Sequence, residues 1–135
     1  MPNQPSISAA EFRKLPKAKG KIDRDEQDLQ IGCVRWFYLQ YPNELIVHYP
    51  AAGKRSKTAG GINRNMGCIK GFPDLMILAK RANDGGLFIE LKKPGEKPTK
   101  EQFEFLNKLM NKGYRVRWTD NIDEFILIVN TYMAL

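Results

Sequence analysis

Apolar side chains recur every three or four residues early in the chain, as they do on the buried face of a helix. They are Leu29, Cys33, Trp36 and Phe37. Asp23, followed three residues later by Glu26, can cap the first turn, and Pro42 stops the pattern. The sequence therefore predicts a helix over residues 23–41.

Two more helices are predicted in the second half of the chain. Thr99 and Gln102 form a capping box before an apolar stripe, and Gly113 ends that helix. The stripe consists of Phe103, Leu106, Leu109 and Met110. Asp120 or Asn121 caps the last helix. Its core-facing residues are Phe125, Ile126, Val129, Tyr132 and Met133.

Short runs of β-forming residues separate these helices. The runs are residues 45–49, 74–79, 87–91 and 114–119. Residues 83–86, Asn-Asp-Gly-Gly, are a strong turn signal, so the second and third runs should form an antiparallel hairpin. In the last run Val116 and Trp118 share one face, and Arg115 and Arg117 share the other.

The order α-β-β-β-α-β-α predicts an α/β fold with helices packed on a small mixed sheet. The chain has 135 residues, enough for one domain with one core. Residues 1–22 carry prolines and lysines without periodicity, and we expect a loosely ordered basic arm there. Residues 23–135 should form the single domain.

Positive charge is concentrated rather than spread. The net charge is +7 and the isoelectric point about 9.5, which favours a polyanionic partner such as nucleic acid. No acidic residue lies between Glu44 and Asp74, in a stretch whose basic residues are Lys54, Arg55, Lys57, Arg64 and Lys70. A loop as long as residues 50–70 is usually functional or disordered. We predict that it contacts phosphates; the alternative is a solvated segment with no ligand.

Several classes of site are disfavoured by composition. The two cysteines, Cys33 and Cys68, fit neither a disulfide framework nor a zinc pattern, so free thiols are expected. His48 is the one histidine, which argues against a His-based triad. No apolar run is long enough to cross a membrane, and the N-terminus lacks a signal core. We therefore expect a cytoplasmic protein.

Asp74, Glu90 and Lys92 are the candidate chemistry. Glu90 and Lys92 point the same way because side chains alternate along a strand. The open end of the predicted hairpin brings Asp74 beside them. Paired carboxylates suit Mg²⁺, which can make a nucleophile of a bound water. A nearby ammonium can orient that water or stabilise developing charge.

This order of elements and motifs resembles the PD-(D/E)XK nuclease superfamily, and within it the VRR-NUC group (virus-type replication-repair nucleases). The resemblance spans roughly residues 23–130 and implies a restriction-endonuclease-like core. It rests on Gly71-x-Pro73-Asp74, on Glu90-Leu91-Lys92, on Lys93-Pro94-Gly95, on Thr99-x-x-Gln102 and on an acidic residue, Glu26, near the start of the first helix.

The resemblance implies a role for each of these side chains. Asp74 and Glu90 would ligate Mg²⁺ or Mn²⁺, with the Leu91 carbonyl as a further ligand. Lys92 would position or activate the water. Glu26 would complete the metal site directly or through water. Gln102 would lie nearby and steady Lys92 or the phosphate.

The resemblance also implies a homodimeric Mg²⁺-dependent endonuclease that acts on branched DNA, as Holliday-junction resolvases do, in a bacterial or phage-infected cell. Two alternatives stay open. One is a non-catalytic DNA-binding module on the same fold. The other is a metal-free RNA endonuclease that uses His48, Tyr49 and a lysine. Glu26 and Gln102 could also serve only as helix-capping residues.

Overall fold

A computed structural model of the chain describes residues 25–49 and 64–135. Its helices are α2 (Asp25–Gln40), α4 (Lys100–Asn111) and α5 (Ile122–Met133), and its strands are β1 (Ile46–His48), β2 (Leu75–Ile77), β3 (Leu87–Leu91) and β4 (Arg115–Thr119). This is the predicted order. The predicted arm over residues 1–22, the Asp23 cap, and Lys54, Arg55 and Lys57 lie outside the described residues.

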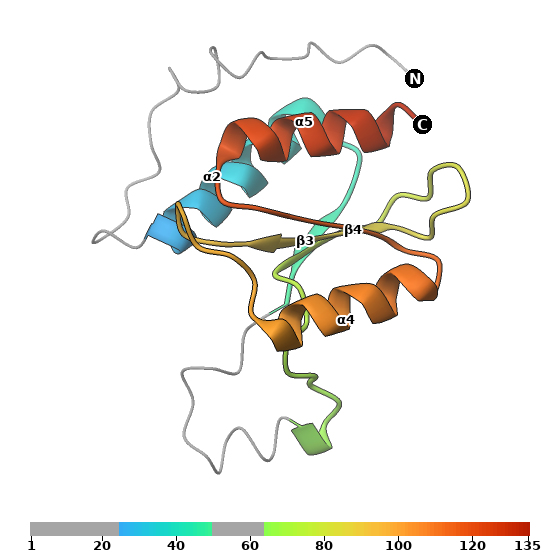
Figure 1. Ribbon diagram of the computed structural model, residues 1–135. Coiled ribbons are helices and arrows are strands. Elements are labelled where there is room, and N and C mark those ends of the chain that lie inside the picture. Colours follow the sequence, from blue (N-terminus) through green and yellow to red (C-terminus); the bar gives the residue numbers. More distant parts are fainter. Residues whose placement is uncertain (1–24, 50–63) are drawn as a thin grey trace.

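The strands form one mixed sheet in the order β1-β2-β3-β4. β2 pairs antiparallel with both β1 and β3, whereas β3 and β4 are parallel. The parallel pair is connected through α4, because parallel neighbours need a crossover. Helices α2 and α5 cover one face of the sheet and α4 covers the other (Figure 1).

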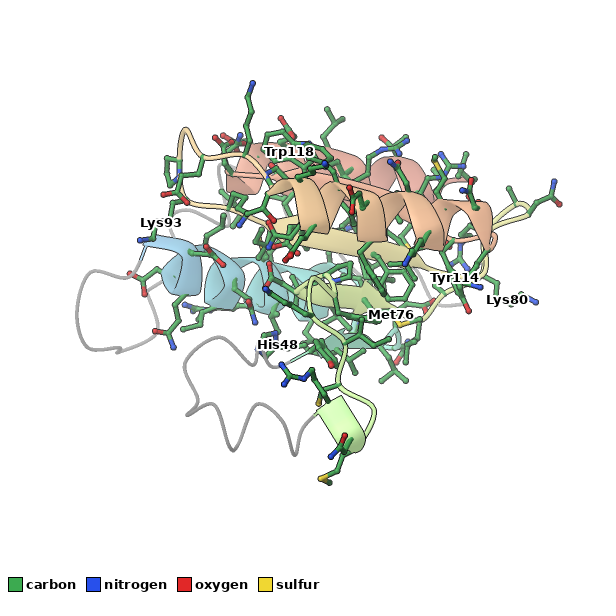
Figure 2. All side chains as sticks on the ribbon, turned by 60° about the horizontal axis from the view of Figure 1, so that its bottom comes forward. His48, Met76, Lys80, Lys93, Tyr114 and Trp118 are labelled. Carbon is green, nitrogen blue, oxygen red and sulfur yellow. The ribbon has the colours of Figure 1, made fainter. Side chains whose placement is uncertain are left out.

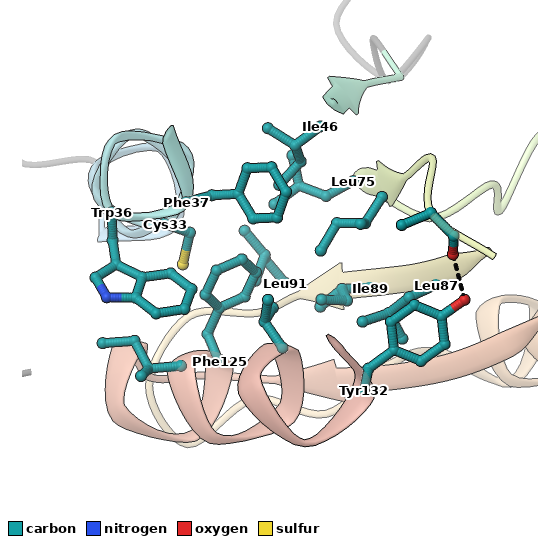
Figure 3. Close-up of a cluster of buried hydrophobic side chains, with 14 residues drawn as sticks. Cys33, Trp36, Phe37, Ile46, Leu75, Leu87, Ile89, Leu91, Phe125 and Tyr132 are labelled. Atoms are coloured by element: carbon teal, nitrogen blue, oxygen red, sulfur yellow. Dashed lines mark hydrogen bonds between the residues drawn. The ribbon is translucent and has the colours of Figure 1, made fainter. Parts of the chain in front are cut away.

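The main core lies between the sheet and the helices α2 and α5 (Figure 3). The strands supply alternate residues from one face: Leu75, Ile77, Leu87, Ile89 and Leu91. The helices supply the predicted apolar stripes, including Cys33, Trp36, Phe37, Phe125, Val129 and Tyr132. The Tyr132 hydroxyl donates to the Ala79 carbonyl, so the end of α5 is fixed to the segment after β2.

A second, aromatic cluster lies on the face that α4 covers. Phe72 is central, with ring centroids 4.5 Å from Tyr49, 5.4 Å from Phe88 and 5.4 Å from Phe105. Phe88 also packs edge-on against Tyr114 at 5.2 Å. The cluster ties the segment before β2 to the sheet and to α4.

The predicted stripe of α4 is partly wrong. Leu106 and Leu109 are buried, but Phe103 and Met110 are 40% and 52% exposed. The helix is turned so that Phe105, which was outside the predicted stripe, faces the aromatic cluster. The reason is tertiary: the Phe72 ring projects from the neighbouring segment and takes Phe105 as its partner.

The hairpin turn between β2 and β3 lies slightly earlier than predicted. Arg81 and Asp84 bond to each other through their backbones, at 3.3 and 2.9 Å, and Ala82 between them has φ 49°. The glycines serve packing instead. A Cβ on Gly86 would lie 3.1 Å from the Ile77 carbonyl oxygen, tighter than nearly all real contacts.

Candidate active site

The predicted site residues meet at one end of the sheet, where β1, β3 and β4 end and β2 begins. Leu75 pairs with Ile89 in the register, so Asp74, one residue earlier, lies opposite Glu90. The backbone N–H of Leu91 donates to Asp74 Oδ2 at 2.8 Å. Asp74 is therefore held against β3 by its own carboxylate. The hairpin does bring the two carboxylates together.

Glu90 is almost completely buried, with 3% of its surface exposed. Its Oε1 accepts from Gln102 Nε2 at 2.9 Å and lies 4.0 Å from Lys92 Nζ. Its Oε2 is also buried and has no hydrogen-bond partner. Buried polar atoms are almost always satisfied, so this free carboxylate oxygen marks a place for a cation or a proton.

The electrostatics of the pair follow from this burial. Desolvation, then the neighbouring charge of Asp74, raises the pKa of Glu90 to about 8, with Lys92 acting in the opposite direction. Desolvation also raises the pKa of Asp74, although the Leu91 N–H partly offsets this. Ionising both of two adjacent desolvated carboxyl groups costs free energy, because the two negative charges repel each other. A proton or a cation must join them.

Gln102 does two things with one side-chain amide. Its Oε1 accepts from the Thr99 backbone N–H at 2.8 Å, and Thr99 Oγ1 accepts from the Gln102 N–H at 3.3 Å, which completes the predicted capping box. Its Nε2 donates to Glu90 Oε1. Helix capping and contact with the site are therefore compatible, and the structure has both.

Lys92 continues β3 beyond its last paired residue, with its backbone N–H donating to the Thr119 carbonyl at 3.0 Å. Its side chain is 13% exposed, against 4% for that of its partner Glu90. The ammonium therefore lies at the rim of the carboxylate pair and not free in solvent.

Glu26 lies in the first turn of α2 and is partly buried. Desolvation, then the charge of Asp74, raises the pKa of Glu26, whereas Lys92 lowers it. Glu26 is thus close enough to the site for the charges of Asp74 and Lys92 to shift its pKa. However, no group of three or more His, Cys, Asp or Glu side chains is placed to hold a metal ion among the residues that the structure describes. The tight pair is Asp74 and Glu90.

The end of β1 contributes His48 and Tyr49, which the sequence suggested only as acid–base groups of a metal-free alternative and not as supports of Asp74. The Asp74 carbonyl accepts from the Tyr49 backbone N–H at 2.9 Å, and His48 Nδ1 lies 2.9 Å from the same oxygen. β1 therefore holds the Asp74 peptide from the other side. The one signal in the sequence for this supporting role was their place at the end of a predicted strand.

The basic residues are only partly described. Arg64 and Lys70 are exposed, and Lys70 Nζ lies 3.3 Å from Glu101 Oε2 in an exposed ion pair. Lys93, beside the first turn of α2 in Figure 2, lowers the pKa of Glu26. Of the described cations, Lys92 is thus the one paired with Glu90, and Lys93 acts on Glu26. Cys33 and Cys68 are free thiols, as expected.

A family model described as "VRR-NUC domain" matches residues 24–120. The chain belongs to the VRR-NUC domain family. This is a nuclease family, and the match contains each of the side chains just described, from Glu26 to Gln102. The resemblance seen in the sequence is thereby confirmed, together with the fold that it implied.

Solved structures agree with this assignment. One VRR-NUC domain protein is 28% identical with a TM-score of 0.71, over 85% of this chain and 93% of that chain. Another VRR-NUC domain is 18% identical with a TM-score of 0.56, over 82% of this chain and 99% of that chain, and supports the fold alone. No curated protein matches the chain. None of the described helices is long and apolar enough to cross a membrane.

Proposed function

We propose that this VRR-NUC protein is a divalent-metal-dependent endonuclease that hydrolyses DNA phosphodiester bonds. One observation carries the proposal. Glu90 is buried with an unpartnered carboxylate oxygen, opposite Asp74 and with Lys92 at the rim. A purely structural strand end would have no reason to bury two acids beside each other, because each raises the cost of ionising the other.

The residues fit a hard cation. Mg²⁺, or Mn²⁺ in its place, would offset the desolvation and the charge repulsion that raise the pKa of Glu90, and it would bind the unpartnered Oε2. Mg²⁺ keeps several waters and needs few protein ligands, so Asp74, Glu90 and the Leu91 carbonyl would hold it, with Glu26 acting through water. When bound, it would supply charge neutralisation and an acidified water.

The surrounding side chains position this centre. Leu91 N–H fixes the Asp74 carboxylate, and the Gln102 amide fixes that of Glu90. Lys92 would orient the attacking water or stabilise the charge that develops on the phosphate, because an ammonium at a desolvated rim interacts strongly with an anion. Fixing these groups before the substrate binds lowers the cost of reorganisation.

We further propose a homodimer with selectivity for branched DNA. The family resemblance to Holliday-junction resolvases supports this, as does the net charge of +7. Arg64 and Lys70, both exposed, would contact phosphates and so position DNA without reading its sequence.

The decisive experiment is cleavage of a labelled four-way junction and a matched linear duplex in Mg²⁺, Mn²⁺ or EDTA. We expect junction nicking that requires metal and disappears in Lys92→Ala. Lys108→Ala, an exposed lysine near the far end of α4, is the control and should cleave like the wild type. Salt-sensitive binding without cleavage in any metal would instead identify a non-catalytic DNA-binding module.

A further inference from the structure

The segment that leads into β2 carries an unusual exposed apolar tip. Met66 is 79% exposed and Ile69 49% exposed. The neighbouring charges are the cations of Arg64 and Lys70. In Figure 1 this segment projects from the body of the domain, clear of the sheet and of α4. Residues 64–70 are called the tip segment below.

The base of the tip segment is fixed to the domain. The backbone N–H of Ile69 donates to the Tyr49 hydroxyl at 2.7 Å, and Lys70 pairs with Glu101. Gly71 has φ +83°, and a Cβ there would lie 3.5 Å from the Glu101 carbonyl oxygen, so the chain turns closely past α4. Phe72 then anchors it in the aromatic cluster. The apolar tip is therefore held out from a rigid support.

The support is shared with the candidate active site. Tyr49, whose hydroxyl holds the tip segment, also donates its backbone N–H to the Asp74 carbonyl at 2.9 Å. Asp74 follows the tip segment in the chain by only a few residues. Tyr49 thus links the base of the tip segment at Ile69 directly to Asp74, so a DNA strand bound at Asp74 and Glu90 would have this base beside it.

We propose that Met66, supported by Ile69, is a wedge that inserts between bases beside the scissile phosphate. This deepens the proposed function and rests on it. A single exposed apolar side chain is ordinary on a protein surface. An exposed methionine flanked by cations matches the apolar wedges that some proteins insert between base steps. The flanking cations would bind the adjacent phosphates.

The wedge gives a physical reason for a preference among DNA structures. Parting stacked bases costs free energy, and it costs least where bases are already unpaired or poorly stacked. Met66 makes no hydrogen bonds with base edges, so it reads deformability and not sequence. Bases at a branch point are the easiest to part, and the wedge would therefore favour junctions over plain duplex.

The test uses the full chain and a four-way junction with 2-aminopurine at the branch point, in Ca²⁺ so that cleavage does not interfere. We expect wild-type binding to raise 2-aminopurine fluorescence, because the base loses its stacking. Met66→Ala should lose most of this rise and reduce the junction-over-duplex preference by roughly tenfold. Met66→Leu, which keeps an apolar side chain, should retain both.

Met110→Ala is the matched control, since Met110 is also an exposed methionine but lies at the far end of α4. It should behave like the wild type. Tyr49→Phe keeps the ring but removes the acceptor for Ile69 N–H, so it should weaken the fluorescence rise. Equal rises in wild type and Met66→Ala, or no rise in the wild type, would overturn the wedge.

Parallel cleavage assays in Mg²⁺ separate this proposal from the proposed function. Cleavage together with a Met66-independent fluorescence signal would reject the wedge and keep the nuclease. A Met66-dependent signal without cleavage in any metal would keep the wedge and reject the nuclease.

Discussion

Glu90 stores an electrostatic cost that few glutamates carry. Its pKa is raised to about 8, first by desolvation and then by the charge of Asp74. Without a cation the pair holds a proton at neutral pH. A metal that binds there must displace this proton, so folding, protonation and metal binding are linked at one residue.

The first prediction concerns stability against pH. The folded-state pKa of Glu90 lies above its ordinary value of 4.5, so the folded state binds the proton more tightly. Its contribution is fully present below about pH 4.5 and is lost as the pH rises through about 8. In EDTA, denaturant unfolding should show the wild type losing stability between pH 5 and 9, by on the order of a few kcal/mol.

Glu90→Gln is the control for this effect, because glutamine resembles the protonated acid and does not titrate. Its stability should change much less over the same pH range and should exceed that of the wild type at pH 9. An equal pH dependence in the two proteins would assign the effect to other groups.

The second prediction concerns metal affinity. If binding displaces one proton, the affinity for Mg²⁺ should rise with pH by roughly tenfold per unit below the pKa of the pair. Isothermal titration calorimetry in buffers of different ionisation enthalpy would count the protons released. Asp74→Asn should abolish the binding, and a pH-independent affinity would contradict a metal site at this pair.

At the scale of elements, the first turn of α4 is where helix and site meet. Thr99 and Gln102 both stabilise the start of the helix, but only Gln102 reaches Glu90. The two contributions can therefore be separated by mutating one residue at a time.

The third prediction follows from that difference. Thr99→Ala should lower the free energy of unfolding by about 1 kcal/mol and leave cleavage almost unchanged. Gln102→Ala should cost a similar stability and also lower kcat by roughly tenfold or more, because Glu90 loses a hydrogen bond to a charged group. Thermal unfolding and single-turnover cleavage would check both. Equal losses of activity would mean that only the cap matters.

Elements also mark the limit of what the sequence could predict. β3 has the predicted bounds because its sequence is apolar except for Glu90 and is followed by the charged Lys92. The register of one hairpin then brings Asp74, Glu90 and Lys92 together. The orientation of α4 could not be predicted in this way. Phe105 turns inward because Phe72, far away in sequence, offers a partner, and no local periodicity encodes that contact.

The contribution of β1 was hidden for a similar reason. His48 and Tyr49 reach Asp74 only because β1 pairs with β2, and a strand of three residues carries little signal about its neighbour. The closeness of Glu26 to the site likewise depends on how α2 packs on the sheet. The apolar stripe of α2 predicts which face of the helix is buried but not where along the sheet the helix lies.

At the scale of the whole molecule, one end of the domain collects features that favour an anion. Helices α4 and α5 both begin there, capped by Thr99 and Asn121, so their positive dipole ends face the same region. Lys70, paired with Glu101 in the first turn of α4, lies beside this end, and Lys92 borders the carboxylate pair. Cations and helix N-termini therefore accompany the acidic groups at this end of the domain.

The fourth prediction is the salt dependence of DNA binding. Affinity should fall steeply with salt, and Arg64→Ala should reduce the logarithmic slope by about 1. Glu101→Gln should strengthen binding, because Lys70 no longer has to leave its carboxylate partner. Lys108→Ala is the control. Fluorescence anisotropy across a salt series would measure all of these, and an unchanged slope in Arg64→Ala would remove Arg64 from the DNA contacts.

The Gln102 amide makes one hydrogen bond to the helix cap and one to the site, and this limits which side chains can replace it. The carbonyl end serves Thr99 and the amino end serves Glu90, so the position needs an acceptor and a donor on one side chain. Glutamate differs by a single atom and would keep the acceptor, yet it would set a third negative charge against Glu90. A substitution at this position therefore has to serve both the helix cap and the carboxylate contact, and glutamate would serve only the first.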